Sequence, residues 1–199
     1  MVSKVVFATG NKNKVMEAGE ILGELGLTVI SQKDAGIETE VDENGTTFSE
    51  NALIKARAVA GKCTDAVVIA DDSGLEVDAL GGEPGIYSSR YMGEDTSYEV
   101  KNREIIKRLQ GITGDGRSAR FVCAVAAVLP DGRELSVRET VEGVIAHAPC
   151  GKGGFGYDPI FLVPELGKTT AELSAEEKNR ISHRGKALRA MCRLLEEAL

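Results

Sequence analysis

In the first half of the chain, short apolar runs alternate with segments of helical periodicity. The runs VVFA (5–8), LTVISQ (27–32) and AVVIA (66–70) have the length and composition of buried strands. The helical patterns between them cover about residues 15–25 and 47–63. The predicted apolar faces are Val15, Ala18, Leu22 and Leu25 in the first and Phe48, Ala52, Ala56 and Val59 in the second. Strands separated by helices of this length usually pair in parallel within one sheet. The alternation therefore predicts an α/β fold.

A β-hairpin is predicted in the second half of the chain. The apolar run RFVCAVAAVL (120–129) is joined by a P-D-G turn to RELSVRETVEGVI (133–145). A hairpin added to the parallel strands of the first half gives a mixed sheet. We therefore expect a mixed α/β protein that forms a single domain over residues 1–199, with a cleft between two lobes.

Three helix starts are marked by a hydroxyl residue followed three positions later by glutamate. This spacing occurs at Thr47, Thr96 and Ser174, and it is typical of a capping box. The helix from Thr96 should run to about Gln110. After the helix from Ser174, Ser182 could begin a further one, with Leu188, Met191 and Leu195 on its inner face.

The composition excludes several classes of protein. The net charge of −7 argues against a protein that coats nucleic acid. No apolar run approaches the ~20 residues needed to span a bilayer, and the first residues lack the pattern of a signal peptide. We therefore expect a cytoplasmic protein. Its four cysteines form no C-x-x-C pair, so we expect thiols rather than zinc ligands.

The turn after the first predicted strand, TGNKNK (9–14), has the composition of a phosphate site. Gly10 allows a ligand to approach the backbone closely. The N–H groups and the dipole of the helix that follows favour an anion. Lys12 or Lys14 would add full positive charge. The alternative, a turn between strand and helix with solvated lysines, fits this segment equally well, and a Walker A pattern is absent.

Two adjacent acids, Asp71 and Asp72, follow the apolar run 66–70. The carboxyl end of a parallel strand is where α/β proteins usually bind ligands, and Mg²⁺ is often held by one or two carboxylates. Because successive strand side chains point to opposite faces, only one of the two acids should serve a site. These residues do not say which one. The motif alone slightly favours a plain D-D-S-G turn.

A second metal carboxylate could come from an acidic segment just before residue 47. Its members are Glu38, Glu40, Asp42 and Glu43. Most of these side chains should simply be solvated. The helix that follows places Asn51 and Lys55 four positions apart on one face. Taken alone, Lys55 is better explained as a solvated lysine than as a phosphate ligand.

The glycine-rich segment GGFGYDP (153–159) suggests a loop whose backbone approaches a planar ligand. Phe155 could stack on that ligand, and Asp158 could accept from its ring N–H groups. In the alternative, the segment is a tight bend with Phe155 and Tyr157 in the core.

Basic residues gather in KNRISHRG (178–185). If Ser182 caps a helix, His183 and Arg184 occupy its first turn, where the helix dipole disfavours cations. Such a local conflict points to a functional site. A structural histidine and solvated basic helix faces are the alternatives.

Five long motifs stand in order along nearly the whole chain. They are TGNKNK (9–14), ENGTTFSENALIKA (43–56), IADDSGLEVDALGGEPGIYSSRY (69–91), GGFGYDPIF (153–161) and AELSAEEKNRISHRGKAL (171–188). Together they resemble the inosine/xanthosine triphosphate pyrophosphatase family. The resemblance implies a long central sheet flanked by helices, two lobes around a deep nucleotide-binding cleft, and a homodimer. It also implies Mg²⁺-dependent hydrolysis of ITP, dITP and XTP to the monophosphate and pyrophosphate, which keeps deaminated bases out of DNA and RNA.

The resemblance also assigns roles to residues by motif position. Asp72 is the expected catalytic acid–base residue and a metal ligand, Glu43 is a second metal ligand, and Lys55 lies near the phosphates. Asp71 is then left as an outward-turned residue that anchors the loop GGEPG (81–85). The expected substrate contacts are Thr9, Gly10, Asn11, Lys12, Asn13, Lys14, Ser73, Phe155, Gly156, Tyr157, Asp158, Lys178, His183 and Arg184.

Two other functions fit the same residues. A nucleotide sensor would bind without turnover, although such a protein has less need of a water-activating carboxylate. A related enzyme could act on other substrates, such as modified pyrimidine nucleotides. Preference for hypoxanthine over adenine has a simple explanation, because donors such as Arg184 or Lys178 pair with a 6-oxo group and stay unpaired against a 6-amino group.

Overall fold

The computed structural model describes residues 4–23 and 26–199. Its α-helices are α1 (Lys12–Gly23), α2 (Phe48–Ala60), α3 (Tyr98–Arg108), α4 (Ala175–Ile181) and α5 (His183–Ala198). Its strands are β1 (Lys4–Phe7), β2 (Thr28–Ser31), β3 (Val67–Val77), β4 (Ser118–Val128), β5 (Glu134–Ile145), β6 (Phe161–Val163) and β7 (Lys168–Thr169). Short 3₁₀ turns connect several of these elements.

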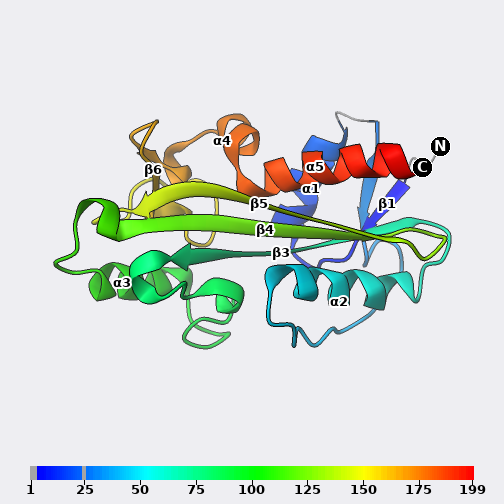
Figure 1. The fold of residues 1–199 in the computed structure, drawn as a ribbon, viewed down its shortest axis with the longest axis horizontal. Coiled ribbons are helices and arrows are strands. Elements are labelled where there is room, and N and C mark those ends of the chain that lie inside the picture. The colour runs from blue at the N-terminus through cyan, green and yellow to red at the C-terminus, as the bar shows by residue number, and fades with distance from the viewer. Residues whose placement is uncertain (1–3, 24–25) are drawn as a thin grey trace. The chain divides into compact units, whose positions relative to one another are not determined.

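The described strands form one mixed sheet in the order β2-β1-β3-β4-β5-β6-β7 (Figure 1). Strand β1 pairs in parallel with both β2 and β3, and Val5 lies opposite Val29 on one side and Val67 on the other. Strand β6 pairs antiparallel with β5 and β7. The predicted hairpin is β4–β5, closed by a turn in which Leu129 donates its N–H to Arg133 O at 2.9 Å. The predicted mixed α/β class is confirmed.

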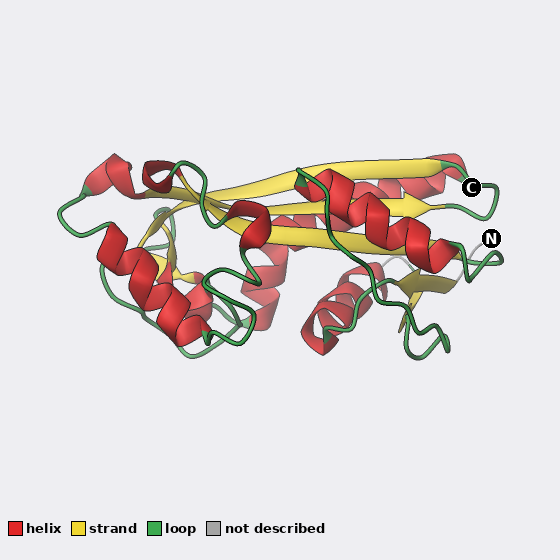
Figure 2. Ribbon diagram, turned by 90° about the horizontal axis from the view of Figure 1, so that it is seen from below, coloured by secondary structure: helices red, strands yellow, loops and turns green. Residues whose placement is uncertain are grey.

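The chain divides into two compact units, and neither is a continuous segment. Unit 1 comprises the described residues up to Asp72 together with 123–139 and 183–199. Unit 2 comprises residues 73–122 and 140–182. Strands β3, β4 and β5, the long yellow arrows of Figure 2, each contribute residues to both units.

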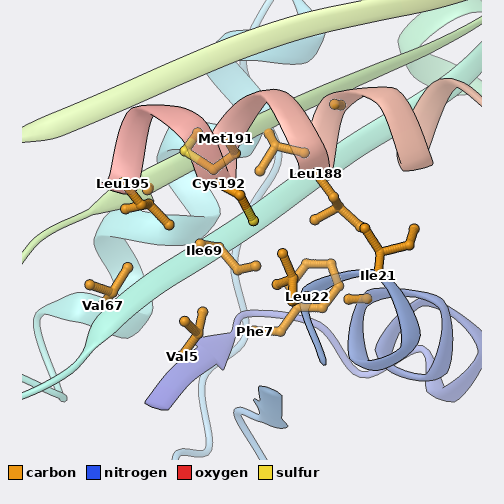
Figure 3. Packing of buried hydrophobic residues seen from close by; sticks show 14 of the residues in the cluster. Val5, Phe7, Ile21, Leu22, Val67, Ile69, Leu188, Met191, Cys192 and Leu195 are labelled. Atoms are coloured by element: carbon orange, nitrogen blue, oxygen red, sulfur yellow. The ribbon is translucent and has the colours of Figure 1, made fainter. Parts of the chain in front are cut away.

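The core of unit 1 lies where α1 and α5 cover strands β1 and β3 (Figure 3). Phe7 and Ile69 from the sheet meet Leu22 from α1 and Leu188 and Met191 from α5. The inner face predicted for the last helix is therefore confirmed, including Leu195. In the first helix Ala18 and Leu22 are buried as predicted; residues 24–25, where that helix was expected to end, lie outside the described residues.

Helix α2 lies on the opposite face of the strands from α5 (Figure 1). Its predicted apolar stripe is buried, and Thr47 accepts a hydrogen bond from the N–H of Glu50 as an N-cap should. The return bond of a capping box goes elsewhere, because the Glu50 carboxylate accepts from the N–H and the hydroxyl of Thr46 at 2.7 Å each. The start and the buried face of α2 therefore follow the prediction.

Unit 2 has its own core, to which β3, β4, β6 and α3 contribute. Leu75, Ile105 and Phe161 are fully buried there. Helix α3 begins one residue later than predicted: its N-cap is Ser97, which accepts from the N–H of Val100, whereas the Thr96 hydroxyl donates to Met92 O at 2.8 Å. The prediction of a capping box at Thr96 was wrong because that hydroxyl closes the preceding turn.

Strand β3 extends well beyond the apolar run that predicted it. It continues through Asp71, Asp72 and Ser73 to Val77, so the D-D-S-G turn was wrong. The apolar run stops at residue 70, but Leu75 and Val77 are buried on the same strand. The two acids therefore lie inside a strand whose geometry persists on both sides of them.

Within the described residues, no helix is long and apolar enough to cross a membrane. Among those residues, none of the four cysteines forms a disulfide, and Cys123 and Cys192 are buried in the core as thiols.

Candidate active site

The carboxylate of Asp72 is the centre of a polar cluster in unit 1. Its Oδ2 accepts from Asn51 Nδ2 at 3.2 Å, and its Oδ1 lies 3.2 Å from Lys55 Nζ. Lys55 Nζ is also 3.2 Å from Oε1 of Glu43. Both Lys55 and Asn51 come from α2, so the spacing of four on that helix brings an amide and an ammonium to the same acid.

Burial shapes the charges of this cluster. It raises the pKa of the Asp72 carboxyl; the Lys55 ammonium opposes this rise, and the nearby Glu43 carboxylate adds to it. For Lys55 burial alone would lower the pKa, but the carboxylates of Asp72, Asp71 and Glu43 outweigh it and raise that pKa. Asp72 is therefore a stronger base than an exposed aspartate, while Lys55 stays charged.

Asn51 is fully buried and joins the two acids of the cluster. Its Nδ2 binds Asp72, and its Oδ1 accepts the N–H of Gly45 at 2.9 Å, two residues from Glu43. A Cβ on Gly45 would lie 2.7 Å from that same Oδ1, so the contact requires glycine. Asn51 therefore fixes the segment that carries Glu43 relative to Asp72, a role that the sequence analysis did not assign.

Glu43 and Asp72 fit the expected metal. Their oxygens converge on one cationic atom, Lys55 Nζ, which shows that the two carboxylates can share a cation. No group of three or more His, Cys, Asp or Glu side chains suited to a metal occurs within residues 4–23 and 26–199. Mg²⁺ is commonly held by one or two carboxylates with phosphate and water oxygens completing the shell, so two acids are enough. The other acids of that segment, Glu38, Glu40 and Asp42, are exposed.

Asp71 lies on the other face of β3 from Asp72, as strand alternation predicted. Its role was predicted wrongly, because it is buried, with 1% of its surface exposed, and binds two cations. Oδ1 accepts from Lys14 Nζ at 2.9 Å, and Oδ2 accepts from Arg184 Nε at 3.2 Å. The loop GGEPG is held instead by its own contacts, such as Val77 N–H to Glu83 O at 3.1 Å.

These cations set the charge of Asp71. Burial alone would raise the pKa of its carboxyl, but Lys14, Arg184 and Lys55 outweigh burial and hold that pKa well below its usual range. Asp71 is therefore an anchoring anion rather than a base.

The position of Arg184 explains how a cation is tolerated in the first turn of the last helix. Its guanidinium is buried between two carboxylates, those of Asp71 and Glu17. A cation in the first turn of α5 is therefore neutralised by α1 and β3 rather than by solvent. His183, the first residue of α5, is also buried, and Ser182 before it has the extended backbone expected of an N-cap.

The predicted phosphate loop is built around an Asn11 cap. Asn11 Oδ1 accepts the N–H groups of Asn13 at 3.0 Å and Lys14 at 3.4 Å, and Thr9 Oγ1 accepts the N–H of Asn11 at 3.1 Å. Lys12 is exposed. A Cβ on Gly10 would meet no atom of the described residues within 4 Å, so internal packing does not demand glycine there.

In unit 2, Asp158 organises the glycine-rich segment. Its Oδ2 accepts from the N–H of Phe155 at 2.7 Å and from Lys178 Nζ at 2.8 Å, and its Oδ1 accepts from the hydroxyl of Thr170 at 2.8 Å. Lys178 Nζ also lies 4.8 Å from the centre of the Phe155 ring, a cation–π contact. Most of the acceptor capacity of Asp158 is therefore used inside the protein, so its predicted contact with a base stays a prediction.

The glycines of this segment are required by the protein itself. A Cβ on Gly153 would lie 2.9 Å from Ala171 O, and one on Gly154, where φ is +69°, would overlap Asp158 Oδ2. Tyr157 is buried and donates its hydroxyl to Ser88 O at 2.7 Å. The tight bend with Tyr157 in the core is thus the better description, and Phe155 is half-buried beside Lys178.

The structure gathers several of the predicted residues into three clusters, two in unit 1 and one in unit 2. In unit 1 it gathers Glu43, Lys55 and Asp72 on one face of β3 and joins Lys14 to Arg184 through Asp71 on the other. In unit 2 it gathers Phe155, Asp158 and Lys178. Ser73 is half-buried and follows Asp72 on β3. The roles of Asn51, Asp71, Glu17 and Thr170 were not predicted from the sequence. Among these residues, only Asn51 has a sequence signal for its role, its spacing of four from Lys55.

Known proteins resemble this chain along nearly its whole length. The model of the Ham1 family matches residues 5–194. A protein of Thermus thermophilus named dITP/XTP pyrophosphatase is 53% identical over 188 residues, which cover 94% of this chain and 89% of that protein.

Two solved structures are also similar along nearly the whole chain. The Ham1 protein of Staphylococcus aureus has a TM-score of 0.87 and 42% identity, covering 98% of this chain and 100% of that one. The nucleoside-triphosphatase / dITP/XTP pyrophosphatase of Mycobacterium abscessus has a TM-score of 0.75 and 40% identity, covering 94% and 98%. The chain described here belongs to the Ham1 family.

Proposed function

We propose that this protein hydrolyses non-standard purine nucleoside triphosphates (ITP, dITP and XTP) to the monophosphate and pyrophosphate. The observation that carries the proposal is the convergence of Glu43 and Asp72 on one cation position, with Lys55 between them. Relatives named dITP/XTP pyrophosphatase, at about half identity over nearly the full chain, support the choice of substrate. We place the reaction in the cytoplasm, where such nucleotides would arise.

Asp72 acts on water in this proposal. Its carboxylate can orient the attacking water and accept its proton, and burial gives it a raised pKa suited to that task. Glu43 and Asp72 would hold Mg²⁺, which would neutralise charge on the phosphate oxygens. Asn51 keeps Asp72 in one orientation through its hydrogen bond at 3.2 Å. A fixed base costs no reorganisation at the moment of reaction.

The cations of unit 1 bind the triphosphate. Lys12 is exposed and Lys14 partly so, and both belong to the first turn of α1, where the helix dipole favours an anion. Lys55 supplies a further charge beside Asp72. Phosphoryl chemistry depends mostly on such positioning and charge neutralisation.

Base recognition is assigned to Phe155 and Lys178 of unit 2, and His183 and Arg184 of unit 1 stay predicted substrate contacts. The Phe155 ring offers a stacking face, and the Lys178 ammonium beside it carries more than one donor. Donors pair with the 6-oxo group of hypoxanthine or xanthine and stay unpaired against the 6-amino group of adenine. Such a mismatch can lower kcat/KM by up to ~10⁴-fold.

A substrate profile tests this proposal. We would measure kcat/KM for ITP, XTP, dUTP and ATP with Mg²⁺, for the native protein and for Asp72→Asn. We expect ITP and XTP to exceed the others, and Asp72→Asn to bind ITP with almost no turnover. Preference for dUTP would show that the substrates are pyrimidine rather than purine nucleotides. Tight ITP binding without turnover by the native protein would indicate a sensor.

We also propose that the protein is a homodimer. Among the described residues, four of the exposed large hydrophobic side chains lie within 14 positions of one another: Tyr87, Met92, Tyr98 and Val100. Apolar surface gathered in one segment is typical of a protein interface. Light scattering should give twice the mass of the chain, and Met92→Glu should lower it; a monomer at all concentrations would contradict the proposal.

A further inference from the structure

The ammonium of Lys55 contacts both carboxylates that would hold the metal, those of Glu43 and Asp72. Its Nζ is 3.2 Å from an oxygen of each carboxylate, and the side chain is largely buried, with 13% of its surface exposed. A lysine and a divalent cation cannot both take these oxygens at close range, because they would repel each other and compete for the same lone pairs.

The Asp72 carboxylate and the backbone near Glu43 are held independently of Lys55. Asn51 donates to Asp72 Oδ2, which leaves Oδ1 directed at Lys55, and the same Asn51 accepts the N–H of Gly45 near Glu43. Asn51 has no exposed surface, so water does not weaken either bond. Removing Lys55 should therefore leave Asp72 and the backbone near Glu43 in place. The two carboxylates would then repel each other unless another cation came between them.

We propose that Lys55 is an internal counter-ion that holds the metal position of Glu43 and Asp72 until a nucleotide brings its own cation. Metal alone must displace the ammonium, so it binds weakly. When a triphosphate brings the metal, Lys55 would move to the phosphate oxygens and so exchange one set of anions for another. This inference rests on the proposed function, because it takes the triphosphate as the metal carrier.

The test measures Mn²⁺ binding without nucleotide, by electron paramagnetic resonance of the free ion. The variants are Lys55→Gln and the closer isostere Lys55→Met. Loss of a charge-assisted contact of this kind corresponds to about a tenfold change in affinity, so both variants should bind Mn²⁺ at least about tenfold more tightly than the native protein. Adding Asp72→Asn to Lys55→Gln should abolish the gain. Circular dichroism checks that each variant is folded.

Lys14→Gln is the matched control. Like Lys55, Lys14 forms an ion pair with an aspartate of β3, in this case Asp71 at 2.9 Å. Lys14 therefore differs from Lys55 in its partners, because Lys55 pairs with Glu43 and Asp72. If the effect were only loss of positive charge, both lysine variants would gain equally, and the proposal would be overturned. Unchanged Mn²⁺ affinity in both Lys55 variants would overturn it too.

Failure of this inference can be told apart from failure of the proposed function. If the native protein hydrolyses ITP while Lys55→Gln gains no Mn²⁺ affinity, only the counter-ion role falls. If the native protein does not hydrolyse ITP, the proposed function is wrong. The inference that a triphosphate carries the metal is then wrong as well.

Discussion

At the scale of single residues, Asp71 and Asp72 divide the cations of unit 1 between them. Asp71 holds Lys14 and Arg184, and Asp72 faces Lys55. Asp71 is thus a positioning residue: it sets where an expected phosphate ligand and an expected base ligand stand without itself needing to touch substrate. This differs from the expectation that Asp71 anchors a loop.

Replacing Asp71 should therefore weaken substrate binding. Asp71→Asn removes the charge that orients Lys14 and Arg184 while keeping the shape of the side chain. We expect KM for ITP to rise about tenfold, which corresponds to about 1.4 kcal/mol, with a much smaller change in kcat. Steady-state kinetics on folded protein provides the measurement.

Asp72→Asn serves as the control for that variant, since it should lose kcat instead. The free energy of unfolding of both variants is measured in parallel, because loss of a buried charge partner also destabilises. Equal losses of kcat at the two positions, with folding intact, would mean that the acids act as a unit and that this division of roles is wrong.

Asn51 gives a second prediction at this scale. Asn51→Ala removes the amide that fixes Asp72 and the Gly45 segment together. Loss of a group that orients a metal ligand typically lowers metal affinity or activity by about 10–100-fold, and we expect kcat/KM to fall within that range. The exposed neighbour Asn44 is the matched control, and an Asn44→Ala variant that lost as much activity would contradict a specific role for Asn51.

Sequence reasoning reached part of this site for a physical reason. Strand alternation shows that the two acids face opposite ways, and helix spacing places Asn51 beside Lys55. Neither rule predicts which residues from distant parts of the chain form ion pairs with these acids. Lys14 and Arg184 lie 57 and 113 positions from Asp71, so only the folded chain reveals that one acid joins them.

At the scale of elements, caps and strand ends were less predictable than the elements themselves. Helix α2 was found because its cap and its apolar stripe agree. Strand β3 was cut short because two charges interrupt its apolar run, although burial and pairing with cations make them acceptable inside a strand. At α3 two adjacent hydroxyl residues competed for the cap, and a hydrogen bond to Met92 O decided the outcome.

A stability prediction belongs to the elements of unit 2. Arg117 is buried and donates to Ile145 O at 2.6 Å, Ala146 O at 2.8 Å, Leu109 O at 2.9 Å and Ile112 O at 3.2 Å. These carbonyls follow α3 or end β5, so one guanidinium ties the two elements together. We expect Arg117→Ala to lower the free energy of unfolding by about 2–4 kcal/mol, because buried acceptors lose a charged donor.

Arg120 is the comparison for Arg117 in chemical denaturation. It sits nearby on β4 and pairs with Asp78 at 2.8 Å and Glu142 at 3.1 Å, both of them exposed. Exposed ion pairs contribute at most about 1 kcal/mol, so Arg120→Ala should have a small effect. Similar losses in the two variants would show that the carbonyl contacts of Arg117 add little.

At the scale of the whole molecule, the class of fold followed from the alternation of strands and helices, since local periodicity carries that information. The expectation of two lobes did not say which segments form the two units, because each unit is assembled from segments far apart in sequence. The net charge of −7 does not predict the local charge of the site. There, lysines and arginines form ion pairs with a few acids.

The bond of ITP that is hydrolysed decides whether the protein is a pyrophosphatase. The direct measurement is phosphorus NMR of the products formed from ITP and Mg²⁺ by the native protein, with Asp72→Asn as the inactive reference. Inosine monophosphate and pyrophosphate, appearing together in equal amounts, are the predicted products. Inosine diphosphate with orthophosphate would contradict the account.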